Sequence, residues 1–141
     1  MAEKLGLMFA GQGAQTPGMG ADLAEKSSAA REVFERADKI LGWKVSDACF
    51  NGPASKLTES KVCQPAIYTM SIACLEALKE RTGAAPFACG GLSLGEFAAA
   101  TAAGVFDFEA GLRLVAKRGE LMQEACRNSD GVMAAVMNAG E

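Results

Sequence analysis

The run Gly91-Leu92-Ser93-Leu94-Gly95 constrains the fold of this chain more than any other feature of its sequence. It fits the pattern G-x-S-x-G, follows a short apolar segment and precedes a stretch of small apolar residues. A strand that turns sharply into a helix holds such a serine in a strained backbone conformation, and the flanking glycines remove Cβ atoms that would clash. The pattern therefore predicts a nucleophile elbow, with the Ser93 hydroxyl above a sheet and the Leu94 N–H aimed at a developing oxyanion. The alternative is a glycine-rich loop whose serine only caps a helix.

Strands and helices alternate along the rest of the sequence. We expect strands over residues 4–9, 87–90 and 132–137. We expect helices over residues 29–41, over 94–103, over 108–127 with Asp107 as the N-cap, and from Pro65 to Gly83. The buried stripe of that last helix would consist of Ile67, Met70, Cys74, Leu75 and Leu78. This order predicts an α/β fold with a parallel sheet.

The strand expected at 132–137 is followed by only four residues. A strand must pair with another strand, and no later residues could cover this one. We therefore expect the sequence to be cut within a domain.

Composition excludes several classes of function. The 141 residues fit one domain, and a net charge of −3 without a Lys/Arg stripe argues against nucleic-acid binding. No apolar run is long enough to span a membrane, and the N-terminus does not resemble a secretory signal. Five cysteines without a C-x-x-C pair predict reduced, mostly buried thiols in a cytoplasmic protein. No metal or cofactor site is expected.

The glycine-rich segment 11–20 follows the first predicted strand. A dinucleotide-binding G-x-G-x-x-G would need glycine where Thr16 stands, and a phosphate-binding P-loop would need lysine where Met19 stands. The segment must therefore have another role, or only turn the chain.

Arg118 lies in the helix predicted over 108–127, on the face that also carries Leu114 and Leu121. A lone helical arginine is usually solvated or paired with a nearby acid. The alternative is a fork for a substrate carboxylate, since guanidinium binds carboxylates in a bidentate manner.

Taken together, the motifs resemble the malonyl-CoA:acyl-carrier-protein transacylase family, which is related to polyketide synthase acyltransferase domains. The segments that resemble family motifs are Gly11-Gln12-Gly13-Ala14-Gln15, Gly18-Met19-Gly20, Gln64-Pro65-Ala66, Gly91-Leu92-Ser93-Leu94-Gly95-Glu96 and Arg118-Gly119 with Met122-Gln123. They occur in the family's order along essentially the whole chain.

The resemblance implies a role for four residues. Ser93 would be the acylated nucleophile, the backbone N–H groups of Gln12 and Leu94 would form the oxyanion hole, and Arg118 would bind the malonyl carboxylate. Leu92 stands where the family usually has histidine, and we expect that difference only to tune the site.

The implied reaction transfers a malonyl group from coenzyme A to acyl carrier protein through a seryl ester, in fatty-acid synthesis. The family's catalytic base is a histidine later in the chain, and this sequence contains no histidine. We therefore expect the chain to be nearly inactive alone.

The resemblance also implies a fold. Residues 1–128 would form the first part of an α/β-hydrolase-like core with an incomplete parallel sheet. Residues 129–141 would begin an inserted ferredoxin-like subdomain.

Two other functions stay open at this point. A serine esterase could use the same elbow, although it predicts neither a carboxylate-binding arginine nor the G-Q-G-x-Q turn. A truncated, non-catalytic half-domain would fit the missing histidine. The choice between malonyl and methylmalonyl groups also stays open.

Overall fold

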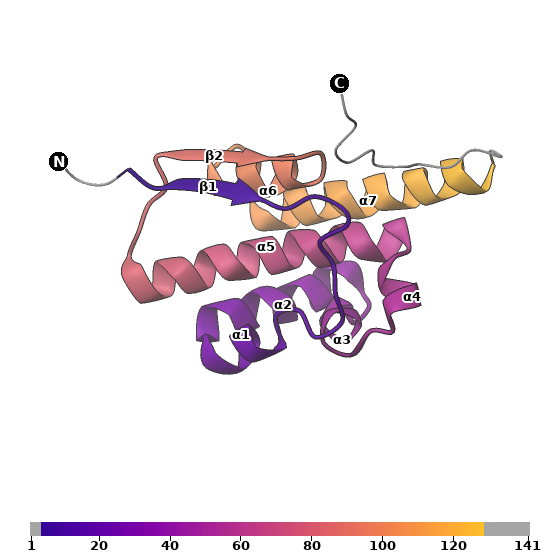
Figure 1. The fold of residues 1–141 in the computed structure, drawn as a ribbon, viewed down its shortest axis with the longest axis horizontal. Helices are drawn as coiled ribbons and strands as arrows, with labels where there is room; N and C mark the ends of the chain where they lie inside the picture. Colours follow the sequence, from indigo (N-terminus) through magenta and orange to yellow (C-terminus); the bar gives the residue numbers. More distant parts are fainter. Residues whose placement is uncertain (1–3, 129–141) are drawn as a thin grey trace, which may run out of the picture.

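The computed structural model describes residues 4–128 (Figure 1). Along the chain the elements are β1 Gly6–Phe9, α1 Ala21–Lys26, α2 Ser28–Leu41, α3 Val45–Asn51, α4 Ala54–Leu57, α5 Ser60–Thr82, β2 Ala88–Gly91, α6 Gly95–Ala102 and α7 Phe108–Arg127. The strand expected over 132–137 lies outside the described residues. The fold is α/β, with a small sheet and mostly helices.

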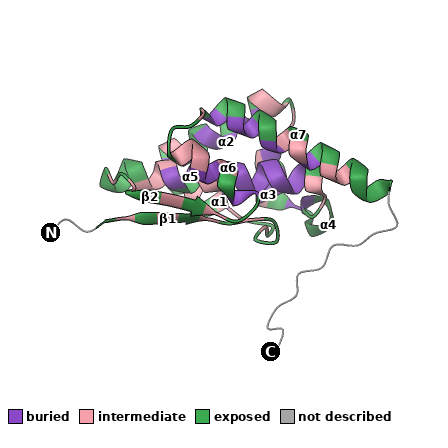
Figure 2. Cartoon of the chain, turned by 90° about the horizontal axis from the view of Figure 1, so that it is seen from above, coloured by how far each residue is buried: buried purple, intermediate pink, exposed green. Residues whose placement is uncertain are grey.

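The sheet consists of β1 and β2, which run parallel, as expected. Their register pairs Gly6 with Ala88 at one end and Phe9 with Gly91 at the other. Figure 2 shows the two strands along one margin of the molecule, with the helices gathered beside them. Because the carboxyl ends of both strands lie at the same edge, the segments that follow Phe9 and Gly91 emerge side by side.

The central helix α5 begins at Ser60, so the prediction that Pro65 opens it is wrong. Proline removes only the N–H that would bond to the carbonyl of residue 61, and the turn before it closes through bonds from Val62 and Cys63 to the Glu59 carbonyl.

The buried surface of α5 is also wider than one stripe. Helices α2, α3, α6 and α7 pack around it, and this explains why residues on nearly every side are buried. Of the predicted stripe, Ile67 and Leu75 are buried, whereas Cys74 is exposed.

Helix α7 matches its prediction in both bounds, and the Asp107 side chain caps it by accepting a hydrogen bond from the Ala110 N–H at 2.8 Å. It packs closely on α5. A Cβ added to Gly111 would lie 2.1 Å from the Tyr68 hydroxyl oxygen, and one added to Gly119 would lie 2.6 Å from the Ser60 carbonyl oxygen. Glycine at these two positions lets the helices approach, and this places Arg118 beside the start of α5.

The five cysteines are free thiols, but only Cys49 and Cys63 are buried. The expectation of mostly buried cysteines is therefore wrong for Cys74 and Cys126, which are exposed on helix surfaces. Burial raises the pKa of the Cys49 thiol to about 12 and that of Cys63 to about 11. Neither buried thiol is set up to act as a thiolate nucleophile at neutral pH.

Two further classes of feature are absent from residues 4–128. None of the helices there is long and apolar enough to cross a membrane. Nor does that part of the chain hold a group of three or more His, Cys, Asp or Glu side chains that could bind a metal ion.

Candidate active site

The turn from β2 into α6 has the geometry expected of a nucleophile elbow. Ser93 has a φ of 52°, the only positive value among the described residues other than glycine. A Cβ on Gly91 would lie 2.1 Å from the carbonyl carbon of Gly95, so the two glycines of the pattern face each other across the turn. Positive φ at a non-glycine residue is strained, and such strain concentrates at functional sites. Ser93 itself is exposed.

The end of β1 packs directly against this elbow. A Cβ on Gly95 would lie 2.3 Å from the Phe9 carbonyl oxygen, and one on Gly11 would lie 2.7 Å from the Leu92 carbonyl oxygen. Only glycine fits at these two positions, because backbone carbonyl oxygens lie too close to leave room for a Cβ atom. The glycine-rich turn therefore does more than reverse the chain, because it brings Gln12 next to the elbow that carries Ser93.

Two backbone amides near Ser93 have no acceptor among the described residues. Within residues 4–128, neither the Gln12 N–H nor the Leu94 N–H donates a hydrogen bond, whereas the Gly95 N–H donates to the Leu92 carbonyl at 2.9 Å. Free amides beside a nucleophile are suited to stabilise the oxyanion of a tetrahedral intermediate.

Arg118 reaches Ser93 from α7. Its Nη2 donates to Ser93 Oγ at 2.9 Å, its Nη1 donates to Gln64 Oε1 at 2.7 Å, and its guanidinium lies 5.8 Å from the centre of the Phe97 ring. No carboxylate within residues 4–128 pairs with it. Its positive charge therefore lies beside Ser93 among neutral groups.

Arg118 shares a side of α7 with Leu114 and Leu121, as expected, but this is not the buried side of the helix. Those leucines are 50% and 53% exposed. The buried side of the helix instead carries Leu112, Val115 and Gly119. Arg118 is half-buried because it sits at the border of these two surfaces, where it bends over Ser93 and Gln64.

Gln64 is a site residue to which sequence reasoning assigned no role. Its side chain is fully buried, and it joins Arg118 to the glycine-rich turn by donating to Gln12 Oε1 at 3.4 Å. The Gln64-Pro65-Ala66 motif was the available signal. The motif indicated a helix start, and it did not show that the amide faces the arginine.

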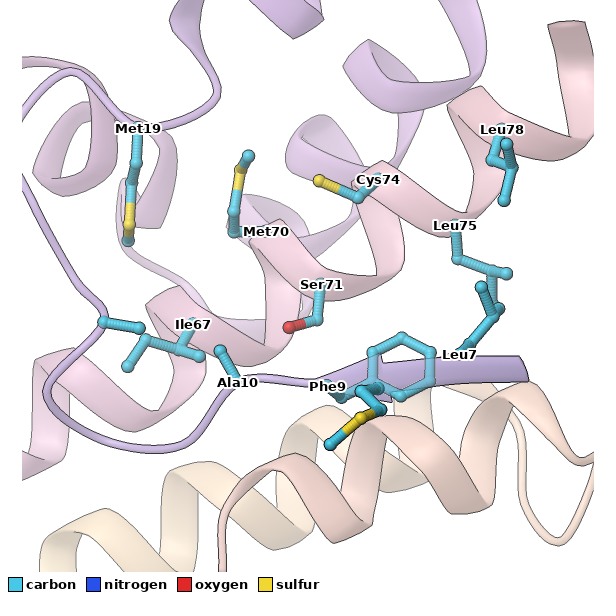
Figure 3. Close-up of a pocket in the computed structure, with 12 residues that line it drawn as sticks. Leu7, Phe9, Ala10, Met19, Ile67, Met70, Ser71, Cys74, Leu75 and Leu78 are labelled. Atoms are coloured by element: carbon cyan, nitrogen blue, oxygen red, sulfur yellow. The ribbon is translucent and has the colours of Figure 1, made fainter. Parts of the chain in front are cut away.

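An apolar cavity of about 360 Å³ lies between β1 and α5 (Figure 3). Side chains such as Leu7, Met19, Met70 and Leu78 line it, and Ser71 is one of its few polar groups. Neither Ser93 nor Arg118 lines this cavity. It is therefore separate from the candidate active site.

The described residues thus bring together a strained serine between close-packed glycines, two amides without an acceptor and an arginine without a carboxylate partner. This arrangement suits acyl transfer through a covalent ester. The sequence model described as "Acyl transferase domain" matches residues 7–141, and the chain belongs to this family.

Within the family, the chain is similar to malonyl CoA-acyl carrier protein transacylases. It is 44% identical to that of Bacillus subtilis over 134 residues, 95% of this chain and 42% of the relative. It is 41% identical to that of Escherichia coli K12 over 130 residues, 92% of this chain and 42% of the relative. The chain thus spans less than half the length of either relative.

Solved structures show the same likeness. The malonyl CoA-acyl carrier protein transacylase of Clostridium perfringens superposes with a TM-score of 0.82 at 44% identity, over 87% of this chain and 39% of that one. A malonyl-transacylase solved with its type II polyketide synthase acyl-carrier protein has a TM-score of 0.82 at 39% identity, over 87% of this chain and 40% of that one. Membership of an acyl transferase family favours transfer over the serine esterase alternative.

Proposed function

We propose that this chain contributes the nucleophile and the carboxylate-binding arginine of an enzyme that transfers a malonyl group from coenzyme A to acyl carrier protein. The observation that carries the proposal is the contact between Arg118 Nη2 and Ser93 Oγ, made by a guanidinium with no carboxylate partner in residues 4–128. In a malonyl ester of Ser93, one methylene separates the ester carbonyl from the carboxylate. A cation that touches the nucleophile is therefore within reach of that carboxylate.

The reaction has two balanced steps. Ser93 Oγ attacks the thioester carbonyl carbon, its proton passes to a base, and the carbon–sulfur bond breaks to release coenzyme A as the thiol once the base returns a proton. The thiol of the carrier protein then gives its proton to the base and attacks the carbonyl carbon of the seryl ester. The carbon–oxygen bond to Ser93 breaks, and the base returns the proton to Ser93 Oγ. The amides of Gln12 and Leu94 would hold the oxyanion of each tetrahedral intermediate.

The chain contains no histidine, so an imidazole base would come from outside this sequence. The resemblance to the family implies a histidine from a later segment. The proposal therefore includes the expectation that the chain alone is inactive, since a serine hydroxyl is a weak nucleophile without a base.

The proposal extends to fold and location. Residues 1–128 would be the first part of an α/β-hydrolase-like core, and residues 129–141 the start of an inserted ferredoxin-like subdomain. The parallel pairing of β1 with β2 and the strand–turn–helix elbow support the first part. The enzyme would act in the cytoplasm, in fatty-acid or polyketide synthesis.

The test uses the completed enzyme, defined as residues 1–141 joined to the part of the Bacillus subtilis relative that follows its matched segment. On mixing with malonyl-CoA, intact-mass spectrometry should show one malonyl adduct, and peptide mapping should place it on Ser93. Ser93→Ala should remove the adduct. The outcome that contradicts the proposal is a malonyl adduct that persists in Ser93→Ala, or a wild-type protein that forms none.

A further inference from the structure

Gln64 is a polar residue in an apolar environment. It lies on α5 with 0% of its surface exposed, between the core residues Cys63 and Ala66. A buried amide costs free energy unless hydrogen bonds replace those it made to water. The contacts of Gln64 therefore indicate why an amide occupies this position.

The hydrogen bonds fix which way the amide faces. Oε1 accepts from Arg118 Nη1 at 2.7 Å, while Nε2 donates to Gln12 Oε1 at 3.4 Å and contacts Met122 Sδ at 3.0 Å. A guanidinium has only donors, so only the oxygen of the amide can face Arg118. The Gln64 side chain thus has one stable orientation, set by groups from the glycine-rich turn and from α7.

The neutrality of Gln64 matters as much as its geometry. Its oxygen holds Nη1 in place and leaves the positive charge of Arg118 intact, while Nη2 lies 2.9 Å from Ser93 Oγ. These contacts use two of the five N–H groups of the guanidinium. No other acceptor within residues 4–128 bonds to the group, so three N–H groups remain for an incoming carboxylate. A carboxylate at position 64 would orient the arginine equally well, but it would neutralise the cation before any substrate arrived.

We propose that Gln64 is a positioning residue that holds Arg118 beside Ser93 without neutralising it, and thereby sets the preference for acyl groups that end in a carboxylate. The inference rests on the proposed function, because it concerns the acyl group that Ser93 accepts. It assigns to Gln64 an effect on specificity that acts through Arg118 and not through contact with the reacting carbonyl.

The experiment compares kcat/KM for malonyl-CoA and acetyl-CoA in the completed enzyme and in three variants. Gln64→Glu keeps the acceptor but adds a charge, and Gln64→Met keeps the length but removes the acceptor. Thr69→Val is the matched control, since Thr69 is also fully buried on α5 and its hydroxyl has no partner within residues 4–128. The ratio of the two kcat/KM values does not depend on the fraction of folded protein, so it separates positioning from folding.

Gln64→Glu should lower the malonyl-to-acetyl ratio about tenfold or more, chiefly through a higher KM for malonyl-CoA, because the new carboxylate competes with that of the substrate. Gln64→Met should lower the ratio by about threefold or more, because Arg118 loses the hydrogen bond to Gln64 Oε1 and is held less firmly beside Ser93. Thr69→Val should stay within about twofold of wild type, as expected for a site away from the contacts. Ratios within twofold of wild type in both Gln64 variants would overturn the inference. Failure of the proposed function would appear differently, as a wild-type enzyme that does not transfer malonyl.

Discussion

Arg118 holds a positive charge that no described carboxylate neutralises, and it holds that charge against the hydroxyl of a strained serine. Its contacts are with an amide, a hydroxyl and the face of an aromatic ring. Arginine surrounded by neutral groups is suited to bind an anion, and the planar guanidinium matches a carboxylate better than an ammonium does. Under the proposed function, Arg118 would therefore distinguish acyl groups by their charge.

Replacement of Arg118 by alanine in the completed enzyme should lower kcat/KM for malonyl-CoA about 10- to 150-fold. This range corresponds to the loss of a charge-assisted hydrogen bond worth about 1.5–3 kcal/mol, which suits a half-buried site better than the larger cost of a fully buried charge. The rate with acetyl-CoA should not fall in parallel. Arg118→Lys should restore activity only in part, because an ammonium cannot present a fork.

Steady-state kinetics with both thioesters on wild type, Arg118→Ala and Arg118→Lys provide the check. Equal loss with malonyl-CoA and acetyl-CoA would mean that Arg118 is structural, and the carboxylate-binding role would then be wrong.

The elbow between β2 and α6, together with the end of β1, forms one close-packed unit of backbone. Gly91 faces Gly95 across the turn, and Gly95 in turn faces the carbonyl of Phe9. Side chains are absent at these points because main-chain atoms fill the space where a Cβ would stand. The elbow therefore depends on glycine at two of its five positions, and the neighbouring Gly90 offers a contrast, since nothing lies within 4 Å of its Cβ position.

Gly91→Ala should destabilise the completed enzyme by about 3 kcal/mol, because the new methyl group would overlap backbone that cannot move away as a flexible side chain could. Gly90→Ala, one residue earlier in the same strand, should be neutral or stabilise by up to about 1 kcal/mol through the lower entropy of the unfolded chain. Denaturant unfolding of both variants measures the difference. Similar free energies of unfolding for the two variants would contradict the close packing of the elbow.

Residues 4–128 show considerable apolar surface. Met8 is 94% exposed in β1, Leu92 is 77% exposed in the elbow, and Phe87 is 69% exposed just before β2. The apolar cavity beside β1 adds to this surface, and each of the two strands has one unpaired edge in the described sheet. Unpaired strand edges and contiguous apolar patches are the usual sites of association between chains.

The 141-residue chain expressed alone should therefore self-associate, or form a compact state that binds a hydrophobic dye and lacks a sharp melt. Met8→Lys should reduce the association, because a charge on an edge strand opposes pairing with another chain. Light scattering and thermal unfolding monitored by near-ultraviolet circular dichroism are the measurements, with the completed enzyme as the control. A monomer with a cooperative thermal transition would show that this surface does not drive association.

The features that the sequence determined by itself are local ones. The Asp107 cap depends on an amide three residues away, and the contact between Gly91 and Gly95 lies within five residues, so both could be predicted without knowledge of the rest of the fold. The end of α2 at Gly42, whose φ of 73° suits glycine, belongs to the same class. The resemblance to the family added the predicted roles of Ser93 and Arg118.

Only the tertiary structure decided how those pieces meet. The start of α5 ahead of Pro65 and the burial of Gln64 depend on the helices that surround α5. The contact between Arg118 and Ser93 joins residues 25 positions apart, and Gly111 and Gly119 let the helix that carries Arg118 lie close to α5. A pattern of apolar spacing shows which side of a helix is buried, but the distance between two helices is set by the atoms of both. For that reason the sequence could single out Ser93 and Arg118 as candidate site residues, whereas only packing could place their side chains 2.9 Å apart.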